Sequence, residues 1–273
     1  RKTDHGSVGL PVGGLTAGAF YPDAVFGTKP YQYAYDAPDP LTEIKNYGGA
    51  LKIDLETGAG TLTSTTSYTL SRYLERVDVD ASYSPQCLAA APTTFACIAF
   101  VDTQPNDNFL QDLLFTSEKM GRFSFVIGAN YFNSKGDLSG IISDFSSGAR
   151  PGAPNVVYNP LLTATTRVKT EAIGVFAQAD FDLTEQLILT AGLRYSYEKK
   201  QGFVTFFGSP FLNFANPNWD AFTPRLGLRY AIDGRSNVYA TFSKGFKSGI
   251  LPILTVGAPV NPEKITAYEV GYK

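Results

Sequence analysis

Six charged residues stand out because they lie in segments where apolar residues occupy every second position, and the charges fall between those apolar residues. Arginine side chains bind anions, and carboxylates can act in acid–base chemistry or hold cations. The spacing predicts that all six lie on one polar face of a sheet. There we expect cross-strand ion pairs between arginines and carboxylates rather than a pair of catalytic acids. The six are Arg194, Arg225, Arg229, Asp180, Asp182 and Glu198.

The chain lacks the residues that enzymes commonly use. It has one histidine, His5, and no nucleophile elbow, phosphate-binding loop, dinucleotide fingerprint or zinc-protease motif. Asp78 and Asp80 form only a short acidic pair, which is a weak signal for calcium. Two cysteines far from the histidine do not make a zinc site. We therefore expect no enzymatic activity, no metal site and no cofactor.

The two cysteines, Cys87 and Cys97, lie ten residues apart in a segment rich in proline and alanine. Such a spacing in a surface segment predicts a disulfide and hence an oxidising compartment. Two unrelated free thiols are the alternative.

Composition narrows the class of protein. The 273 residues carry a net charge of −2 without a basic tail or stripe, which argues against nucleic acid as a partner. No apolar run reaches the roughly 18 residues of a membrane-spanning helix, although a membrane β-barrel stays compatible with the mean hydropathy of −0.07. The chain starts at Arg1 and ends within a strand-like pattern, so we expect an internal fragment of a longer protein.

Apolar and polar residues alternate with a period of two in at least five segments, which is typical of strands with one apolar face. Taken together, the apolar rows of these segments comprise 23 positions without a charged residue, whereas seven charged residues lie in the alternate positions. The rows are Phe123 to Tyr131, Val175 to Phe181, Leu187 to Tyr197, Phe222 to Tyr230 and Val238 to Phe242.

Connections alternate between short and long. Short turns are expected at Glu56–Thr61, Glu118–Arg122, Asp182–Gln186 and Ile232–Ser236, and long loops at Ala81–Pro105, Ser139–Thr163, Val204–Pro217 and Ile250–Asn261. This alternation predicts an all-β antiparallel up-and-down meander of about ten strands, as in an outer-membrane barrel with short turns on one rim. A soluble β-sandwich is the alternative, because any sheet with one buried face shows the same period.

Four segments resemble the barrel of TonB-dependent outer-membrane receptors, the iron-complex and siderophore receptors in particular. They are Ala172–Lys200, Phe222–Tyr230, Val238–Gly249 and Pro262–Lys273, and Phe109–Lys119 with Phe123–Phe132 is similar to an earlier hairpin. The resemblance implies a 22-stranded transmembrane barrel in a Gram-negative outer membrane, closed by a plug and coupled to the TonB complex. Residues 1–273 would be part of that barrel, without the plug and the C-terminal strands.

The resemblance also implies active uptake of a scarce solute, with a ferric siderophore or other iron complex as the default. The inward arginines would suit an anionic chelate, or would hold the plug through its acidic groups. A passive porin or adhesin-type barrel, or a secreted β-sandwich binding module, are the alternatives. Expected solute contacts are aromatic residues in the long loops, with packing between loops as the other interpretation. They are Phe145, Tyr158, Phe206 and Phe211.

Overall fold

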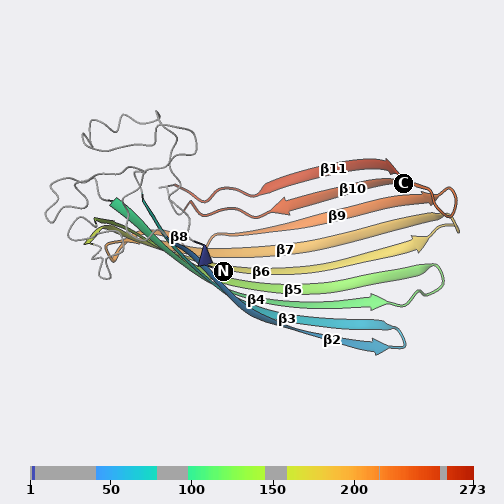
Figure 1. Cartoon of the computed structure of the whole chain (residues 1–273). Coiled ribbons are helices and arrows are strands. Elements are labelled where there is room, and N and C mark those ends of the chain that lie inside the picture. The colour runs from blue at the N-terminus through green and yellow to red at the C-terminus, as the bar shows by residue number, and fades with distance from the viewer. Residues whose placement is uncertain (1, 4–40, 79–97, 145–158, 215, 253–256) are drawn as a thin grey trace, which may run out of the picture.

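A computed structural model describes residues 2–3, 41–78, 98–144, 159–214, 216–252 and 257–273. These residues form one antiparallel sheet whose strands lie side by side in chain order (Figure 1), with β8 pairing only to β7. The predicted all-β meander of about ten strands is thereby confirmed. The strands are β1 (Lys2–Thr3), β2 (Leu41–Thr57), β3 (Gly60–Asp78), β4 (Ile98–Ser117), β5 (Phe123–Asp144), β6 (Asn159–Asp182), β7 (Leu187–Phe206), β8 (Ser209–Phe214), β9 (Asn218–Ala231), β10 (Asn237–Lys247) and β11 (Glu263–Tyr272).

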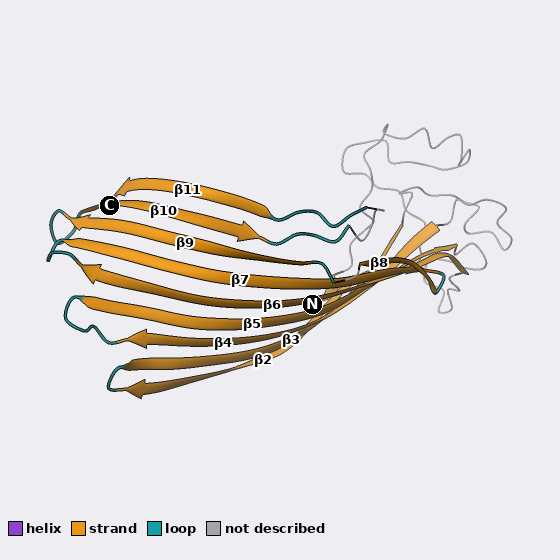
Figure 2. Cartoon of the chain, turned by 180° about the vertical axis from the view of Figure 1, so that it is seen from behind, coloured by secondary structure: helices purple, strands orange, loops and turns teal. Residues whose placement is uncertain are grey.

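All four predicted short turns are present, and they lie at the same rim (Figure 2, teal). Backbone hydrogen bonds between Met120 and Phe123 close the turn before β5, and side chains close the other three. Thr57 donates its hydroxyl to the Gly60 carbonyl at 2.7 Å, and Thr184 Oγ1 accepts from the amides of Gln186 and Leu187. Asp233 accepts from the amides of Arg235 and Ser236. Side chains that bond the backbone two or three residues on are what tight turns require.

The sheet exposes its apolar face. Residues paired across antiparallel strands point to the same side, so the predicted rows of β5, β6, β7 and β9 join into one apolar surface. On it Leu193 is 49% exposed, Val175 50% and Phe222 63%. A continuous apolar surface of this size needs an apolar covering, because water contact with it is unfavourable. No second layer of described residues covers it, which argues against the β-sandwich.

The strands extend far beyond the apolar rows. β6 has 24 residues, whereas about 9 to 11 tilted residues cross a bilayer. On the outward face of β5, Tyr131 is followed by Asn133, Lys135 and Asp137, and the row on β6 changes in the same way. Each long strand thus has an apolar portion next to the short turns and a polar portion at the other end. In the described part of the chain, no helix has the length and apolar character of a membrane span.

Three predicted loops are shorter than expected because strands continue into them. β4 begins at Ile98, within the loop predicted over Ala81–Pro105, and β5 and β6 occupy both ends of the loop predicted over Ser139–Thr163. Most of Val204–Pro217 is the hairpin of β7 and β8. The predictions failed because adjacent residues there, such as Phe100 with Val101 and Phe211 with Leu212, are both apolar, so the ladder persists without a period of two to reveal it.

Parts of the predicted loops lie outside the described residues. These parts include both cysteines, Cys87 and Cys97, and the aromatic residues Phe145 and Tyr158. The disulfide and the role of these two rings stay predictions. In the segment predicted as a loop over Ile250–Asn261, the backbones of Ile250 and Val260 pair in an isolated antiparallel bridge.

Candidate functional site: the polar face of the sheet

The face opposite the apolar rows holds the six charged residues that the sequence singled out. In the strand ladders, Arg194 stands opposite Phe176 and Thr223, and Asp180 stands opposite Ser124 and Thr190. These positions alternate with the apolar rows, and the register places all six on one face of the sheet. We call it the inner face.

Arg194 is held at the centre of the inner face by three contacts. Its Nε donates to Ser196 Oγ at 2.9 Å, and its Nη2 donates to Asn130 Oδ1 at 3.0 Å. The guanidinium also lies over the Phe176 ring, 5.7 Å from the centroid. Gly174 makes this position possible, because a Cβ there would lie 2.1 Å from Arg194 Nη2. The arginine is therefore fixed in place without a carboxylate partner among the described residues.

The predicted cross-strand pairing of arginines with carboxylates is wrong. Asp180 accepts a hydrogen bond from the Thr190 hydroxyl at 2.5 Å, and Asp182 pairs with Lys119 at 2.5 Å. Glu198 pairs with Lys200 on its own strand at 2.9 Å. Residues two apart in a strand share a face, and a long lysine side chain reaches back along the strand. The same spacing recurs in the pairs Lys52–Asp54 and Lys169–Glu171.

Arg225 and Arg229 have no carboxylate within ion-pair distance in the described structure. Both line a groove on the inner face of β9 to β11. Tyr239 in this groove donates to Glu269 at 2.7 Å, and Lys273 lies over the Tyr239 ring at 5.6 Å. The groove therefore carries three cations against one carboxylate and can attract an anionic group.

A cluster that sequence reasoning missed surrounds Lys200, further along the inner face. Its ammonium donates to the Gly249 carbonyl at 2.8 Å and to Ser248 Oγ at 3.3 Å, and lies 5.8 Å from the Trp219 ring centroid. Ser248 also donates to Glu198. The contacts hold the segment after β10 against β7. No sequence pattern predicts a contact between Lys200 and Ser248, which are 48 positions apart. The only signal in this cluster is that Trp219 is the single tryptophan of the chain.

A small apolar core adjoins this cluster. Val204 is 3% exposed, Leu251 5% and Phe214 9%. Gly202 lets Leu251 approach, because a Cβ there would lie 2.6 Å from Leu251 Cδ1. The segment after β10 is thus packed onto the hairpin of β7 and β8, and it covers part of the inner face.

Two of the predicted solute contacts lie in this hairpin and not in an irregular loop. Phe206 ends β7 and Phe211 belongs to β8. Their ring centroids are 4.7 Å apart at an edge-to-face angle of 67°. The rings therefore pack against each other, as the alternative interpretation had it, while Phe211 stays 51% exposed.

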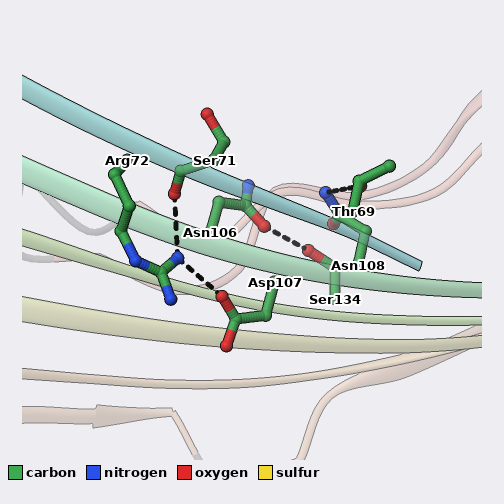
Figure 3. A network of polar contacts seen from close by, with 7 residues as sticks. All are labelled: Thr69, Ser71, Arg72, Asn106, Asp107, Asn108 and Ser134. Carbon is green, nitrogen blue, oxygen red and sulfur yellow. Dashed lines mark hydrogen bonds and ion pairs between the residues drawn. The ribbon is translucent and has the colours of Figure 1, made fainter. Parts of the chain in front are cut away.

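The inner face of β2 to β4 is lined by hydroxyl, amide and acidic groups. Figure 3 shows Asn106 and Asn108 of β4 in hydrogen bonds with Ser134 and Thr69. Further along, Gln104 donates to Asp102 at 2.5 Å. Glu75 stands directly opposite Asp102 in the ladder, with Tyr73 beside it on the same face. One side of the inner face is thus hydroxyl-rich and acidic, and the side near β9 is basic.

No set of three histidine, cysteine or acidic side chains in the described residues could hold a metal ion.

Comparisons with known proteins agree on the architecture. A family model described as "TonB dependent receptor-like, beta-barrel" matches residues 2–273. No curated protein matches in sequence. The crystal structure of the ferric yersiniabactin uptake receptor FyuA from Yersinia pestis aligns at a TM-score of 0.67 and 18% identity, covering 86% of this chain and 34% of that one.

Two structures from Acinetobacter baumannii are also similar. The siderophore receptor PiuA aligns at a TM-score of 0.65 and 16% identity, covering 99% of this chain and 43% of that one. The ferric preacinetobactin receptor BauA aligns at 0.56 and 17%, covering 90% and 38%. The chain thus spans roughly a third to two fifths of these structures, and at such identities they share its fold.

Proposed function

This chain belongs to the TonB-dependent receptor β-barrel family, and from that premise we propose that the full-length protein imports a scarce solute across the outer membrane of a Gram-negative bacterium. Proteins of this family are transport receptors, and we propose no enzymatic activity. The observation that carries the proposal is the reversed exposure of the sheet. Its apolar rows face outward as if toward lipid, while the polar face holds Arg194 in place and lines a groove with Arg225 and Arg229.

We propose a ferric siderophore or another iron complex as the solute. The receptors FyuA, PiuA and BauA, whose folds this chain shares, are named for ferric or siderophore ligands. Within this chain, Arg225 and Arg229 line a groove without a carboxylate partner among the described residues. Such cations suit a chelate that carries carboxylate or phenolate oxygens.

The remainder of the full-length protein is part of the proposal. We propose that residues 1–273 form a portion of a 22-stranded barrel, and that a separate plug domain fills it and reaches the TonB complex. Arg225 and Arg229 would then face either the solute or acidic groups of the plug. Substituting both by glutamine separates the two roles, because loss of solute affinity with intact assembly indicates direct contact.

Aromatic side chains near the rim opposite the short turns are the proposed contacts for the organic part of the chelate. Phe211 and Trp219 are the best placed among the described residues, and Phe145 and Tyr158 complete the proposal. Changing each to alanine and measuring solute binding tests it. Unchanged affinity in all four variants would move the binding site elsewhere.

Uptake measurements test the proposed function as a whole. The full-length gene is expressed under iron limitation, and uptake of labelled ferric chelates is compared in cells with and without TonB. We expect uptake only with TonB. Uptake that is equal in both strains would instead indicate a passive porin.

A further inference from the structure

A groove on the outward face lies just beyond the apolar rows. Its lining includes Lys135, Asp137, Arg167, Lys169 and Phe203. The ladder places Lys135 opposite Lys169 and Asp137 opposite Arg167, on the same side as Tyr131. Lys135 is four residues beyond Tyr131, which corresponds to about 13 Å along the strand. With the strand tilt of a barrel, this height matches the headgroup layer next to the hydrocarbon core.

The groove and its rim carry an excess of positive charge. Five basic residues, Arg72, Lys135, Arg167, Lys169 and Lys199, face three acidic ones, Asp107, Asp137 and Glu171, on these rows. The local sum is +2, in a chain whose net charge is −2.

All three carboxylates are already occupied. Arg167 binds both oxygens of Asp137 at 2.7 and 2.8 Å. Arg72 pairs with Asp107 at 2.7 Å, as Figure 3 shows, and Lys169 with Glu171 at 2.6 Å.

Lys135, Lys169 and Lys199 therefore share one carboxylate, that of Glu171, which Lys199 faces directly across the ladder. Among the described residues, neither Lys135 nor Lys199 makes a hydrogen bond or an ion pair. Lys135 also stands directly opposite Lys169 in the ladder, and like charges in directly opposed positions destabilise a sheet. Glu171 offsets part of that cost, and an anion bound between the two ammonium groups would offset the remainder.

We infer that this groove binds the phosphate group of an anionic lipid in the outer leaflet. The inference rests on the proposed membrane location, since the groove then opens at headgroup height beside the acyl chains. Lys135 and Lys169 would hold the phosphate from two strands, with the Lys199 side chain on the membrane side. Arg167 is fixed beneath by Asp137 and lies 5.3 Å from the Phe203 ring centroid, so the wall of the groove is rigid.

The experiment uses the purified full-length receptor and the double variant Lys135→Ala/Lys169→Ala. Both are placed in nanodiscs of neutral phosphatidylcholine, with and without phosphatidic acid, and their unfolding temperatures are compared. We expect phosphatidic acid to raise the unfolding temperature of the wild type but not of the variant. In neutral lipid the variant and the wild type should be similar in stability, because the variant removes both the repulsion between the opposed lysines and the ion pair of Lys169 with Glu171.

The control variant Lys52→Ala/Lys247→Ala removes the same charge from the inner face, and it should keep the response to phosphatidic acid. An equal response in wild type and Lys135→Ala/Lys169→Ala would overturn the inference. So would full stabilisation by inorganic phosphate in neutral lipid, which would assign the groove to a soluble anion. A wild-type receptor that fails to enter membranes would instead contradict the proposed function.

Discussion

At the scale of single residues, the inner face is built from side chains whose positions depend on small neighbours. Gly174 is the clearest case, because it leaves room for the Arg194 guanidinium. The alternation of residue types could predict that Arg194 faces inward. It could not predict the hydrogen bond to Asn130, 64 positions away in the chain.

Replacing Gly174 by alanine should displace Arg194 from Asn130. A Cβ at 2.1 Å from Arg194 Nη2 and 2.3 Å from Asn130 Oδ1 forces both side chains to move, and losing such a hydrogen bond costs about 1 kcal/mol. Urea unfolding of the full-length protein measures this. Gly227→Ala is the control, since its nearest neighbour would lie at 3.5 Å. Equal stability of both variants would show that the contact contributes nothing.

The turn at Asp233 should be sensitive to pH. Amide hydrogen bonds from Arg235 and Ser236 hold the pKa of this carboxyl below its usual value. A lowered pKa in the folded state means that the turn is stabilised above the ordinary aspartate pKa, about 4, and that this stabilisation is lost as the pH falls through the lower folded value. Asp233→Ala should be less stable than the wild type at pH 7.

The difference between wild type and Asp233→Ala should shrink at the most acidic pH that the folded protein survives. Asp233→Asn keeps an acceptor and should lie between them at pH 7. Amide hydrogen exchange in the β9–β10 turn reports the effect locally, and a difference that does not change with pH would contradict the assignment.

At the scale of elements, the apolar portions of the strands were predictable and the polar portions were not. The rows on β5, β6, β7, β9 and β10 follow from period-two alternation, because only one face meets an apolar surrounding. Beyond Tyr131 apolar and polar residues no longer alternate, so the strand continues through ladder hydrogen bonds that leave no periodic signal. The predicted pairs between arginines and carboxylates are wrong for a different reason, because the carboxylates bind other partners. Only Glu198 has its partner, Lys200, two positions along the same strand, whereas Asp182 pairs with Lys119 and Asp180 bonds Thr190 on the neighbouring strand.

Charge on the apolar rows should be costly, whereas charge on the inner face should not. Leu189→Arg places a cation among outward apolar side chains and should destabilise the assembled barrel by about 2–4 kcal/mol near the bilayer midplane. Thr190→Arg, one residue further, points inward toward Asp180 and should be mild. Heat-modifiable migration of the membrane fraction compares the two. Equal damage would mean that the faces are assigned the wrong way round.

The hairpin of β7 and β8 should depend on its pair of aromatic rings. Phe211→Ala removes the contact with Phe206 and should cost about 0.5–1.5 kcal/mol beyond the lost burial. Limited proteolysis should then cleave near residues 207–208 sooner than in the wild type. Phe207, which is 63% exposed, offers the control Phe207→Ala, for which we expect little change.

At the scale of the whole molecule, the antiparallel order puts every short turn on one rim and the ends of the polar portions on the other (Figure 1). In the proposed membrane location, the first rim faces the periplasm and the second the outside of the cell.

Labelling of intact cells tests this orientation. A membrane-impermeant maleimide should react with Ser209→Cys in the β8 hairpin and spare Arg235→Cys in the β9–β10 turn. Both positions are exposed on the protein, so a difference in labelling reports the side of the membrane on which each lies. The parent protein serves as the control for Cys87 and Cys97, which should not react if they form the predicted disulfide. Reaction at Arg235→Cys alone would reverse the orientation.

The strand order has a consequence for assembly and for evolution. Apart from β8, each strand in the described part of the chain pairs only with the strands next to it along the path from β1 to β11, so these ladders form between segments that emerge consecutively from the ribosome. A sheet of this order can form by adding one hairpin at a time to an existing edge strand, and no step requires a distant part of the chain. The same order means that gaining or losing a hairpin would change the circumference and leave the other pairings unaltered.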